Sequence, residues 1–204
     1  MDLKEKLKPE HTALLVIDIQ NDFASPEGLL GRGGRDLSLV DPMIEKLGKL
    51  ADAAKRANVL TLYTQHKFDR SKLNDLQKEQ YDLDGRTVTC DIKTDGWHFY
   101  RINPPAEDVY EKYAYSAFSS RALTSRLEAY GIKTIVITGM DAIYCVESTI
   151  RSGFDLGYKI VVPEDLIAGN ARHLPWQEKT LELTKKTFGV VTSSEELERA
   201  WHVD

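Results

Sequence analysis

Residues 12–18 read Thr12-Ala-Leu-Leu-Val-Ile-Asp18, an apolar run that ends on a carboxylate. Strands buried on both faces of a parallel sheet carry continuous apolar runs, whereas strands with one wet face alternate apolar and polar residues. A second run of the same type, Lys133-Thr-Ile-Val-Ile-Thr-Gly139, lies further along the chain. We therefore expect both stretches to be buried strands of a parallel sheet.

Strand-like and helix-like segments alternate around these two runs. Asp41-Pro42 predicts an N-cap and a first-turn proline, and a capping box, Ser193-x-x-Glu196, marks the start of the last helix. Further strands are expected at 59–64, 108–112, 159–162 and 190–191, and further helices at 120–130, 145–156 and 175–186. Residues 66–105 show no sustained period. Strands separated by helices predict right-handed crossovers and a three-layer α/β sandwich.

The composition is that of an ordinary globular domain. The chain has 204 residues, 42% apolar and 29% charged, so we expect a single domain over residues 1–204. With 27 Lys and Arg against 32 Asp and Glu, the net charge of −5 argues against a nucleic-acid partner. The longest aliphatic run, Ala13–Ile17, is far shorter than the roughly 20 residues of a membrane helix, and no signal segment is evident. Two cysteines are too few for a disulfide framework, and we expect a cytoplasmic protein without a membrane partner.

Three residues capable of chemistry stand near the ends of predicted strands, where ligands bind in sheets of this kind. Asp18 and Lys112 end two strands, and Cys145 follows Gly139 at the expected start of a helix. Taken singly, they can be a loop cap, a solvated edge lysine and an inert buried cysteine. Taken together, they can supply a base, a cation and a nucleophile. A helix N-terminus and a nearby ammonium lower a thiol pKa from its usual value of about 8.5, so we expect an ionised sulfur at neutral pH.

Four stretches of the chain match, in order, the motifs of one enzyme family. They are Ala13-Leu-Leu-Val-Ile-Asp-Ile-Gln-Asn-Asp-Phe23, Lys112 with Tyr115-Ser-Ala-Phe118, Gly131-Ile-Lys-Thr-Ile-Val-Ile-Thr-Gly139, and Cys145-Val-Glu-Ser-Thr-Ile-Arg-Ser-Gly-Phe-Asp-Leu-Gly-Tyr158. On these residues the chain resembles the isochorismatase-like cysteine hydrolases, which include nicotinamidases, carbamoylsarcosine amidases and ureidoacrylate amidohydrolases. The resemblance implies a Rossmann-like fold with a six-stranded, mostly parallel sheet, and assembly into a homodimer or homotetramer.

The resemblance also implies roles for individual residues. Asp18, Lys112 and Cys145 would form the catalytic triad, and the backbone N–H groups of Asp141 and Cys145 would bind the oxyanion of a tetrahedral intermediate. A cis peptide bond would lie between Met140 and Asp141. The candidate residues of the substrate pocket are Phe23, His66, Trp97, Tyr115, Phe118, Asp141 and Tyr144.

Four of these pocket candidates have a second interpretation. Trp97 and Tyr144 are by default core-packing residues. His66 is at least as readily a surface histidine. The chain has Asp141-Ala142 where relatives usually place small or hydroxyl residues. The Asp141 carboxylate therefore either contacts a donor-rich substrate group, such as a ureido group, or faces solvent or caps the helix. Cys90 lies in a loop-like stretch and is given no catalytic role.

The sequence predicts an enzyme that uses neither a metal nor another cofactor. Nicotinamidases of this family bind a metal through an Asp-x-His motif and a further histidine after the second strand. Here Thr64-Gln-His-Lys-Phe-Asp-Arg70 offers His66 alone, which argues against nicotinamide as the substrate. We expect a cysteine amidohydrolase that cleaves the C–N bond of a small amide, carbamoyl or ureide compound through a thioester. The alternatives are an isochorismatase-type vinyl-ether hydrolase and a non-catalytic member that binds a small molecule.

Overall fold

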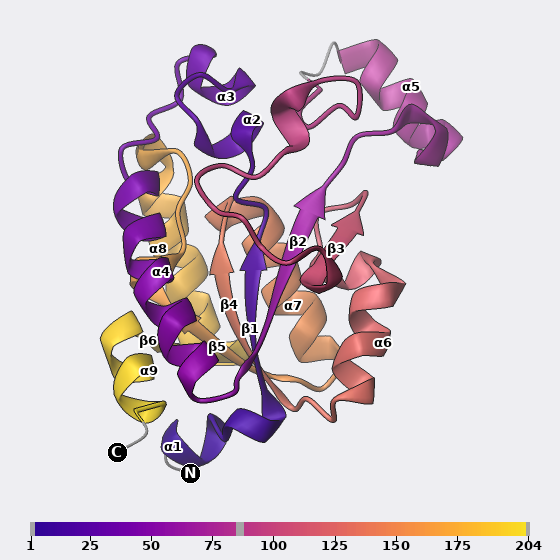
Figure 1. Ribbon diagram of the computed structural model, residues 1–204. Coiled ribbons are helices and arrows are strands. Elements are labelled where there is room, and N and C mark those ends of the chain that lie inside the picture. Colours follow the sequence, from indigo (N-terminus) through magenta and orange to yellow (C-terminus); the bar gives the residue numbers. More distant parts are fainter. Residues whose placement is uncertain (1–2, 85–87, 203–204) are drawn as a thin grey trace.

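The molecule is built on a six-stranded parallel sheet, as predicted (Figure 1). The computed structural model describes residues 3–84 and 88–202. The strand order is β3-β2-β1-β4-β5-β6, and every neighbouring pair is parallel. The strands are β1 (Thr12–Ile17), β2 (Leu60–His66), β3 (Val109–Lys112), β4 (Thr134–Gly139), β5 (Lys159–Pro163) and β6 (Gly189–Thr192).

Helices cover both faces of the sheet, which makes the predicted three-layer sandwich (Figure 1). The helices are α1 (Leu3–Lys6), α2 (Asn21–Ala24), α3 (Leu29–Arg32), α4 (Val40–Arg56), α5 (Asp75–Asp84), α6 (Arg121–Ala129), α7 (Glu147–Asp155), α8 (Leu174–Leu183) and α9 (Ser194–Ala200). Helices α4 and α9 pack on one face, and α6 and α7 pack on the other. No helix in the described part of the chain is both long enough and apolar enough to cross a membrane.

The central strand β1 shows why the apolar runs are continuous. All six of its residues are buried. Leu14 and Val16 pack into the cluster beneath α4, whereas Leu15 and Ile17 pack into the cluster beneath α6 and α7. Since successive side chains point to opposite faces, a strand covered on both sides needs apolar residues at every position.

Two local expectations differ from the structure. Helix α4 begins at Val40 with Leu39 at the N-cap, so the prediction of Asp41 as the N-cap is wrong. Asp41 lies in the first turn instead, and its carboxylate pairs with Arg101 at 2.9 Å. Helix α5 was missed because it has almost no apolar face: Leu76 and Leu83 are 65% and 76% exposed.

The candidate site residues lie at the carboxyl ends of the strands. There β1 lies between β2 and β4, and β3 pairs with β2, so Lys112 lies beside His66 in the sheet. Gly139 ends β4 at a φ of +105°, and a Cβ there would lie 2.1 Å from the Ile17 carbonyl oxygen. Only glycine fits this close approach, which brings the turn after β4 against the end of β1.

Candidate active site

An acid, an amine and a thiol from three different strand ends meet at this edge. Lys112 Nζ lies 2.6 Å from Asp18 Oδ2 and 3.4 Å from Cys145 Sγ. The side chains of Asp18 and Lys112 are both 0% exposed, and Cys145 is 6% exposed. The structure therefore brings together the three residues that the sequence predicted as a triad.

Asp18 is held in place by its backbone and by Thr64. It follows β1 with a φ of +48°, a conformation that non-glycine residues seldom adopt. Its Oδ1 accepts a 2.7 Å hydrogen bond from the Thr64 hydroxyl, a fully buried group on the neighbouring strand. Thr64 thus fixes one carboxylate oxygen and leaves the other facing Lys112.

Lys112 is a fully buried ammonium surrounded by acceptors. Besides Asp18 and Cys145, its Nζ donates to the carbonyl oxygens of Ala114 at 2.9 Å and Tyr115 at 3.0 Å. Burial alone would lower the pKa of Lys112, but Asp18 and Cys145 outweigh it and the pKa is raised. The lysine therefore stays positively charged at neutral pH, a state that buried lysines reach only with partners of this kind.

Cys145 lies in a tight turn between β4 and α7. The peptide bond between Met140 and Asp141 is cis, as the family resemblance implied. Residues Ala142–Val146 form one turn of π-helix that leads into α7. The Cys145 carbonyl accepts a 2.6 Å hydrogen bond from the Thr149 hydroxyl. The thiol is thereby presented to Asp18 and Lys112 from the start of a helix.

The charge state of the thiol differs from the expectation of a resting thiolate. Burial raises the pKa of Cys145, and so do the Asp18 charge and a hydrogen bond to it. Lys112 lowers the pKa but does not compensate for burial. At neutral pH the sulfur is therefore protonated. The sequence pattern suggested the cation but gave no measure of how deeply the sulfur lies.

Of the two predicted oxyanion donors, Asp141 is the N-cap of this turn and Cys145 lies within it. The Asp141 carbonyl accepts hydrogen bonds from the N–H groups of Tyr144 at 3.0 Å and Val146 at 3.2 Å, and Ala142 N–H donates to Ala168 at 2.9 Å. Within the described residues, no acceptor takes up the Asp141 N–H.

Three of the pocket candidates lie near the ends of β1 and β2. The ring of Phe23 lies 6.0 Å from the ring of His66. Burial and the nearby Lys112 lower the pKa of His66 to about 4, so its imidazole is neutral at pH 7. Its buried Nδ1 has no hydrogen-bond partner among the described residues. Trp97 is half-buried, with Lys67 Nζ 4.0 Å above its ring.

A residue that the sequence analysis missed connects these groups. Gln20 is fully buried and donates from Nε2 to the carbonyls of His66 at 2.8 Å and Trp97 at 2.6 Å. Its Oε1 accepts from the His66 N–H at 2.8 Å. Gln20 thus ties the segment around Trp97 to the end of β2. Its position two residues after Asp18, within the stretch Ala13–Phe23, was the available signal.

The remaining aromatic candidates separate into two environments. Tyr115 and Tyr144 stack on each other with centroids 6.1 Å apart, and both are exposed, at 57% and 41%. They adjoin the backbone that holds Lys112 and Cys145. Phe118 instead stacks on Tyr158 at 5.5 Å and packs against Gly153 of α7. These contacts are those of a core residue, and its place as a pocket wall stays a prediction.

The Asp141 side chain is engaged within the protein. It caps the nucleophile turn by accepting from the Ile143 N–H at 3.3 Å, and it pairs with Arg35 at 3.3 Å. Burial raises its pKa, while Arg35 and His173 oppose this rise. Of the two interpretations drawn from the sequence, these contacts match capping.

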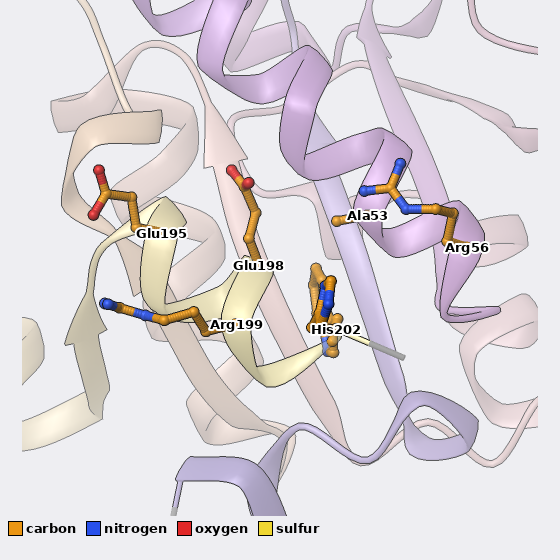
Figure 2. A pocket seen from close by; sticks show the side chains of 7 residues that line it. Ala53, Arg56, Glu195, Glu198, Arg199 and His202 are labelled. Carbon is orange, nitrogen blue, oxygen red and sulfur yellow. The ribbon is translucent and has the colours of Figure 1, made fainter. Parts of the chain in front are cut away.

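One cavity among the described residues lies away from the triad. This cavity of about 730 Å³ lies between α4 and α9, and its lining includes Arg56, Glu198 and His202 (Figure 2). It lies at the opposite end of the sheet from the catalytic candidates, near the start of β2. Among residues 3–84 and 88–202, no group of three or more His, Cys, Asp or Glu side chains is placed to hold a metal ion.

Comparisons with known proteins agree with this architecture. The model of the isochorismatase domain matches residues 12–196. The ureidoacrylate amidohydrolase RutB of Acinetobacter baylyi is 35% identical in an alignment of length 179 that covers 78% of this chain and 71% of that protein. A cysteine hydrolase from Pseudomonas syringae pv. phaseolicola superposes with a TM-score of 0.81 at 24% identity, covering 96% of this chain and 94% of that one. The N-carbamoylsarcosine amidase of Thermoplasma acidophilum gives a TM-score of 0.70 at 25% identity, covering 90% and 96%. By sequence and by fold, the chain belongs to the isochorismatase family.

Proposed function

We propose that this protein is a metal-independent cysteine amidohydrolase that cleaves the C–N bond of a small amide, carbamoyl or ureide compound. The observation that carries the proposal is the contact of one buried ammonium with both a carboxylate and a thiol. Relatives named as an amidohydrolase and an amidase support hydrolysis of a non-peptide C–N bond. The presence of Cys145 favours acyl transfer over ether hydrolysis, because the latter needs no thiol.

The first half of the reaction transfers an acyl group to sulfur. Asp18 takes the proton of the Cys145 thiol as the sulfur attacks the substrate carbonyl. Lys112 stays positive throughout and stabilises the developing thiolate. The carbonyl oxygen becomes an oxyanion between the N–H groups of Asp141 and Cys145, and one such donor is worth about 10²–10³ in kcat. The tetrahedral intermediate then collapses, and the departing nitrogen takes the proton from Asp18.

The second half returns the enzyme to its starting state. Water attacks the thioester carbonyl and gives a proton to Asp18, while the same two N–H groups bind the new oxyanion. The C–S bond breaks, the acid leaves, and the thiolate recovers its proton from Asp18. Because the thiol starts and ends protonated, its raised pKa fits a mechanism in which Asp18 and the sulfur exchange one proton in each half.

A screen for ammonia release over amides, ureides and carbamates tests the proposal. Cys145→Ala is expected to abolish turnover while near-ultraviolet circular dichroism stays that of the folded protein. Cys90→Ala removes the other buried thiol of the chain and is the matched control, which should keep turnover. Near-normal ammonia release by Cys145→Ala would refute the thioester mechanism.

The screen also separates the alternatives. Release of pyruvate from isochorismate without ammonia from any amide would identify an ether hydrolase. Binding without release of any product would identify a non-catalytic member. A cytoplasmic location, a homodimer or homotetramer, and a single domain over residues 1–204 stay predictions; size-exclusion chromatography with light scattering tests the assembly.

A further inference from the structure

His66 lies at the end of β2, on the face of the sheet that carries the catalytic candidates. In the register of β2 and β3 it is the partner of Lys112. Thr64, two residues earlier, donates its hydroxyl hydrogen to Asp18 at 2.7 Å. Residues i and i+2 of a strand point to one face, and so do partners in a parallel pair. The imidazole therefore lies on the face that holds the Thr64 hydroxyl and the Lys112 ammonium.

Two further observations place His66 beside the thiol and the carboxylate. Leu62, four residues before His66 and on the same face, packs into the buried cluster that contains Cys145. The charges of Lys112 and Asp18 both act on the pKa of His66, in opposite directions. His66 thus belongs to the environment of the three catalytic candidates, although the reaction described above gives it no role.

The backbone of His66 is fully bonded, so its ring is the part that is left for a ligand. Gln20 bonds both the carbonyl and the N–H of His66, each at 2.8 Å. The next residue, Lys67, donates its N–H to the Lys112 carbonyl at 2.9 Å. These bonds fix the position from which the imidazole projects.

The ring carries a polar atom without a partner. Nδ1 of His66 is buried, and no described residue forms a hydrogen bond with it. Because the pKa of His66 falls to about 4, the ring is neutral at pH 7 and one of its nitrogens is a bare acceptor. Buried polar atoms are nearly always paired, so this nitrogen is a place for an atom that the protein itself does not supply.

The other polar groups around the sulfur are donors or are already engaged. Lys112 Nζ donates to the carbonyls of Ala114 and Tyr115 at 2.9 Å and 3.0 Å. The same ammonium contacts the Asp18 carboxylate and the thiol. The two N–H groups proposed for the oxyanion are donors as well. On this face the Nδ1 of His66 is accordingly an acceptor that no described contact occupies.

A water molecule that attacks a thioester needs two acceptors. Its oxygen lone pair is directed at the carbonyl carbon, so both O–H bonds point away from that carbon. Asp18 takes one of the two hydrogens in the proposed reaction. Asp18 and Lys112 are fully buried, so the other hydrogen depends on the protein for an acceptor, and a buried O–H without one costs free energy.

We propose that His66 positions the water that hydrolyses the thioester, by accepting at Nδ1 the hydrogen that Asp18 does not take. The inference rests on the proposed function and adds a residue to its second half. As the C–O bond forms, one proton passes from the water to Asp18, and the other stays on the oxygen and is hydrogen-bonded to Nδ1. The C–S bond then breaks, and Asp18 returns its proton to the sulfur. The imidazole ends the cycle unchanged.

The contact matters less in the first half, because the attacking atom there is the sulfur. An activated ester separates the two halves, since its leaving group departs without a proton. The probe is p-nitrophenyl acetate, which would place an acetyl group on Cys145. Release of nitrophenolate in a stopped-flow instrument gives the acylation rate. Loss of the acetyl mass from the isolated acetyl-enzyme gives the deacylation rate, with Cys145→Ala as the blank.

His66→Ala is expected to slow deacylation and to spare acylation. We expect deacylation to fall about 10- to 100-fold, the scale of one lost hydrogen bond in a positioned reactant. The acylation rate should change less than about twofold, because nitrophenolate needs no acceptor at Nδ1. Acetyl-Cys145 should therefore accumulate. His98→Ala, at a histidine whose side chain is 51% exposed, is the matched control and should follow wild type in both steps.

Two conservative variants and a second nucleophile distinguish this role from a structural one. An asparagine amide lies near the place of Nδ1 and a glutamine amide near that of Nε2. His66→Asn should therefore keep most of the deacylation rate, and His66→Gln should resemble His66→Ala. Hydroxylamine, a stronger nucleophile than water, should release the acetyl group of His66→Ala as a hydroxamate. A distorted site would not recover in this way.

The outcomes that would overturn the inference differ from those that would overturn the reaction. Unchanged deacylation in His66→Ala, or equal losses in acylation and deacylation, would remove His66 from the second half and leave the thioester mechanism standing. Absence of an acetyl group on Cys145 of wild type would overturn the thioester mechanism itself, whatever the His66 variants do.

Discussion

The two cysteines of this chain lie in regions that look alike by burial and differ in their partners. Cys145 and Cys90 are both buried, and burial raises the pKa of each thiol. Cys145 has the Lys112 ammonium 3.4 Å from its sulfur and the Asp18 carboxylate in contact. The sulfur of Cys90 faces the Gly96 carbonyl at 3.6 Å, and its nearest acid is Asp22. Among the described residues, only Cys145 has a cation in hydrogen-bond contact with its sulfur; Lys112 lowers the pKa of Cys90 only from a distance and as the smallest of the causes.

The two acids repeat the contrast. Asp18 and Asp22 are four residues apart, and both are buried. Asp22 accepts from two backbone N–H groups, those of Leu29 at 3.1 Å and Cys90 at 2.7 Å, and so joins two loops. Asp18 accepts from one hydroxyl and faces an ammonium and a thiol. The Asp22 carboxylate accepts hydrogen bonds from backbone N–H groups and so stabilises the fold. The Asp18 carboxylate faces two titratable groups and can exchange a proton with them.

Replacing each acid by its amide gives the sharpest test of this contrast. Asp18→Asn removes the proposed base, and turnover should fall about 10²–10⁴-fold. The same change should make Cys145 more reactive towards iodoacetamide, because Asp18 raises the pKa of that thiol. Alkylation at pH 8, followed by mass spectrometry of the Cys145 peptide, measures this change, with wild type as the reference.

Asp22→Asn is the matched control for a buried carboxylate. It should leave the alkylation rate of Cys145 unchanged, because Asp22 contacts neither Lys112 nor the sulfur in any described interaction. Slower alkylation of Cys145 in Asp18→Asn would contradict the assignment of Asp18 as the group that shares the thiol proton.

Lys112→Met tests the cation in the opposite direction. Lys112 lowers the pKa of Cys145, so its loss should slow alkylation at pH 8 even though the side-chain volume is kept. Asp18 would be left as an unpaired buried charge, and removing one partner of such a pair costs about 3–5 kcal/mol. Urea unfolding measures this loss. Lys67→Met, which breaks a partly exposed pair with Glu111, should cost far less.

The sequence predicted what depends on periodicity and on strand ends. The apolar runs at 12–18 and 133–139 became β1 and β4, because both faces of these strands are covered. Asp18, Lys112 and Cys145 could be placed together because parallel strands all end at one edge of the sheet. The family resemblance, which named the amidohydrolases, is confirmed by the matched domain and by the relatives.

What the sequence did not predict depends on contacts between distant loops. Gln20 and Thr64 gain their roles only when the ends of β1 and β2 lie side by side. The unionised state of Cys145 follows from its depth, which no spacing reveals. Helix α5 could not be predicted because its leucines are exposed and form no apolar stripe. The pair of Arg35 with Asp141 could not be predicted because the two residues are more than 100 positions apart in the sequence.

The buried imidazole of His66 is expected to make the free energy of unfolding depend on pH, an effect smaller than those above. Its pKa falls from 6.5 in the unfolded chain to about 4 in the folded one, chiefly through burial and then through Lys112. Between these values the unfolded chain binds more protons than the folded one, so the free energy of unfolding falls as the pH falls from 6.5 towards 4. The loss amounts to about 3 kcal/mol at pH 4.

Many carboxylates titrate in the same window, so the contribution of His66 must be measured as a difference. His66→Gln keeps a neutral polar side chain that cannot take up a proton, and its stability should fall less steeply between pH 6.5 and 4. His98→Gln, at a histidine whose side chain is 51% exposed, is the control and should follow wild type. Urea midpoints at half-unit steps of pH give the three curves. Parallel curves for wild type and His66→Gln would mean that the imidazole takes up its proton in place, without the electrostatic penalty that burial beside Lys112 imposes.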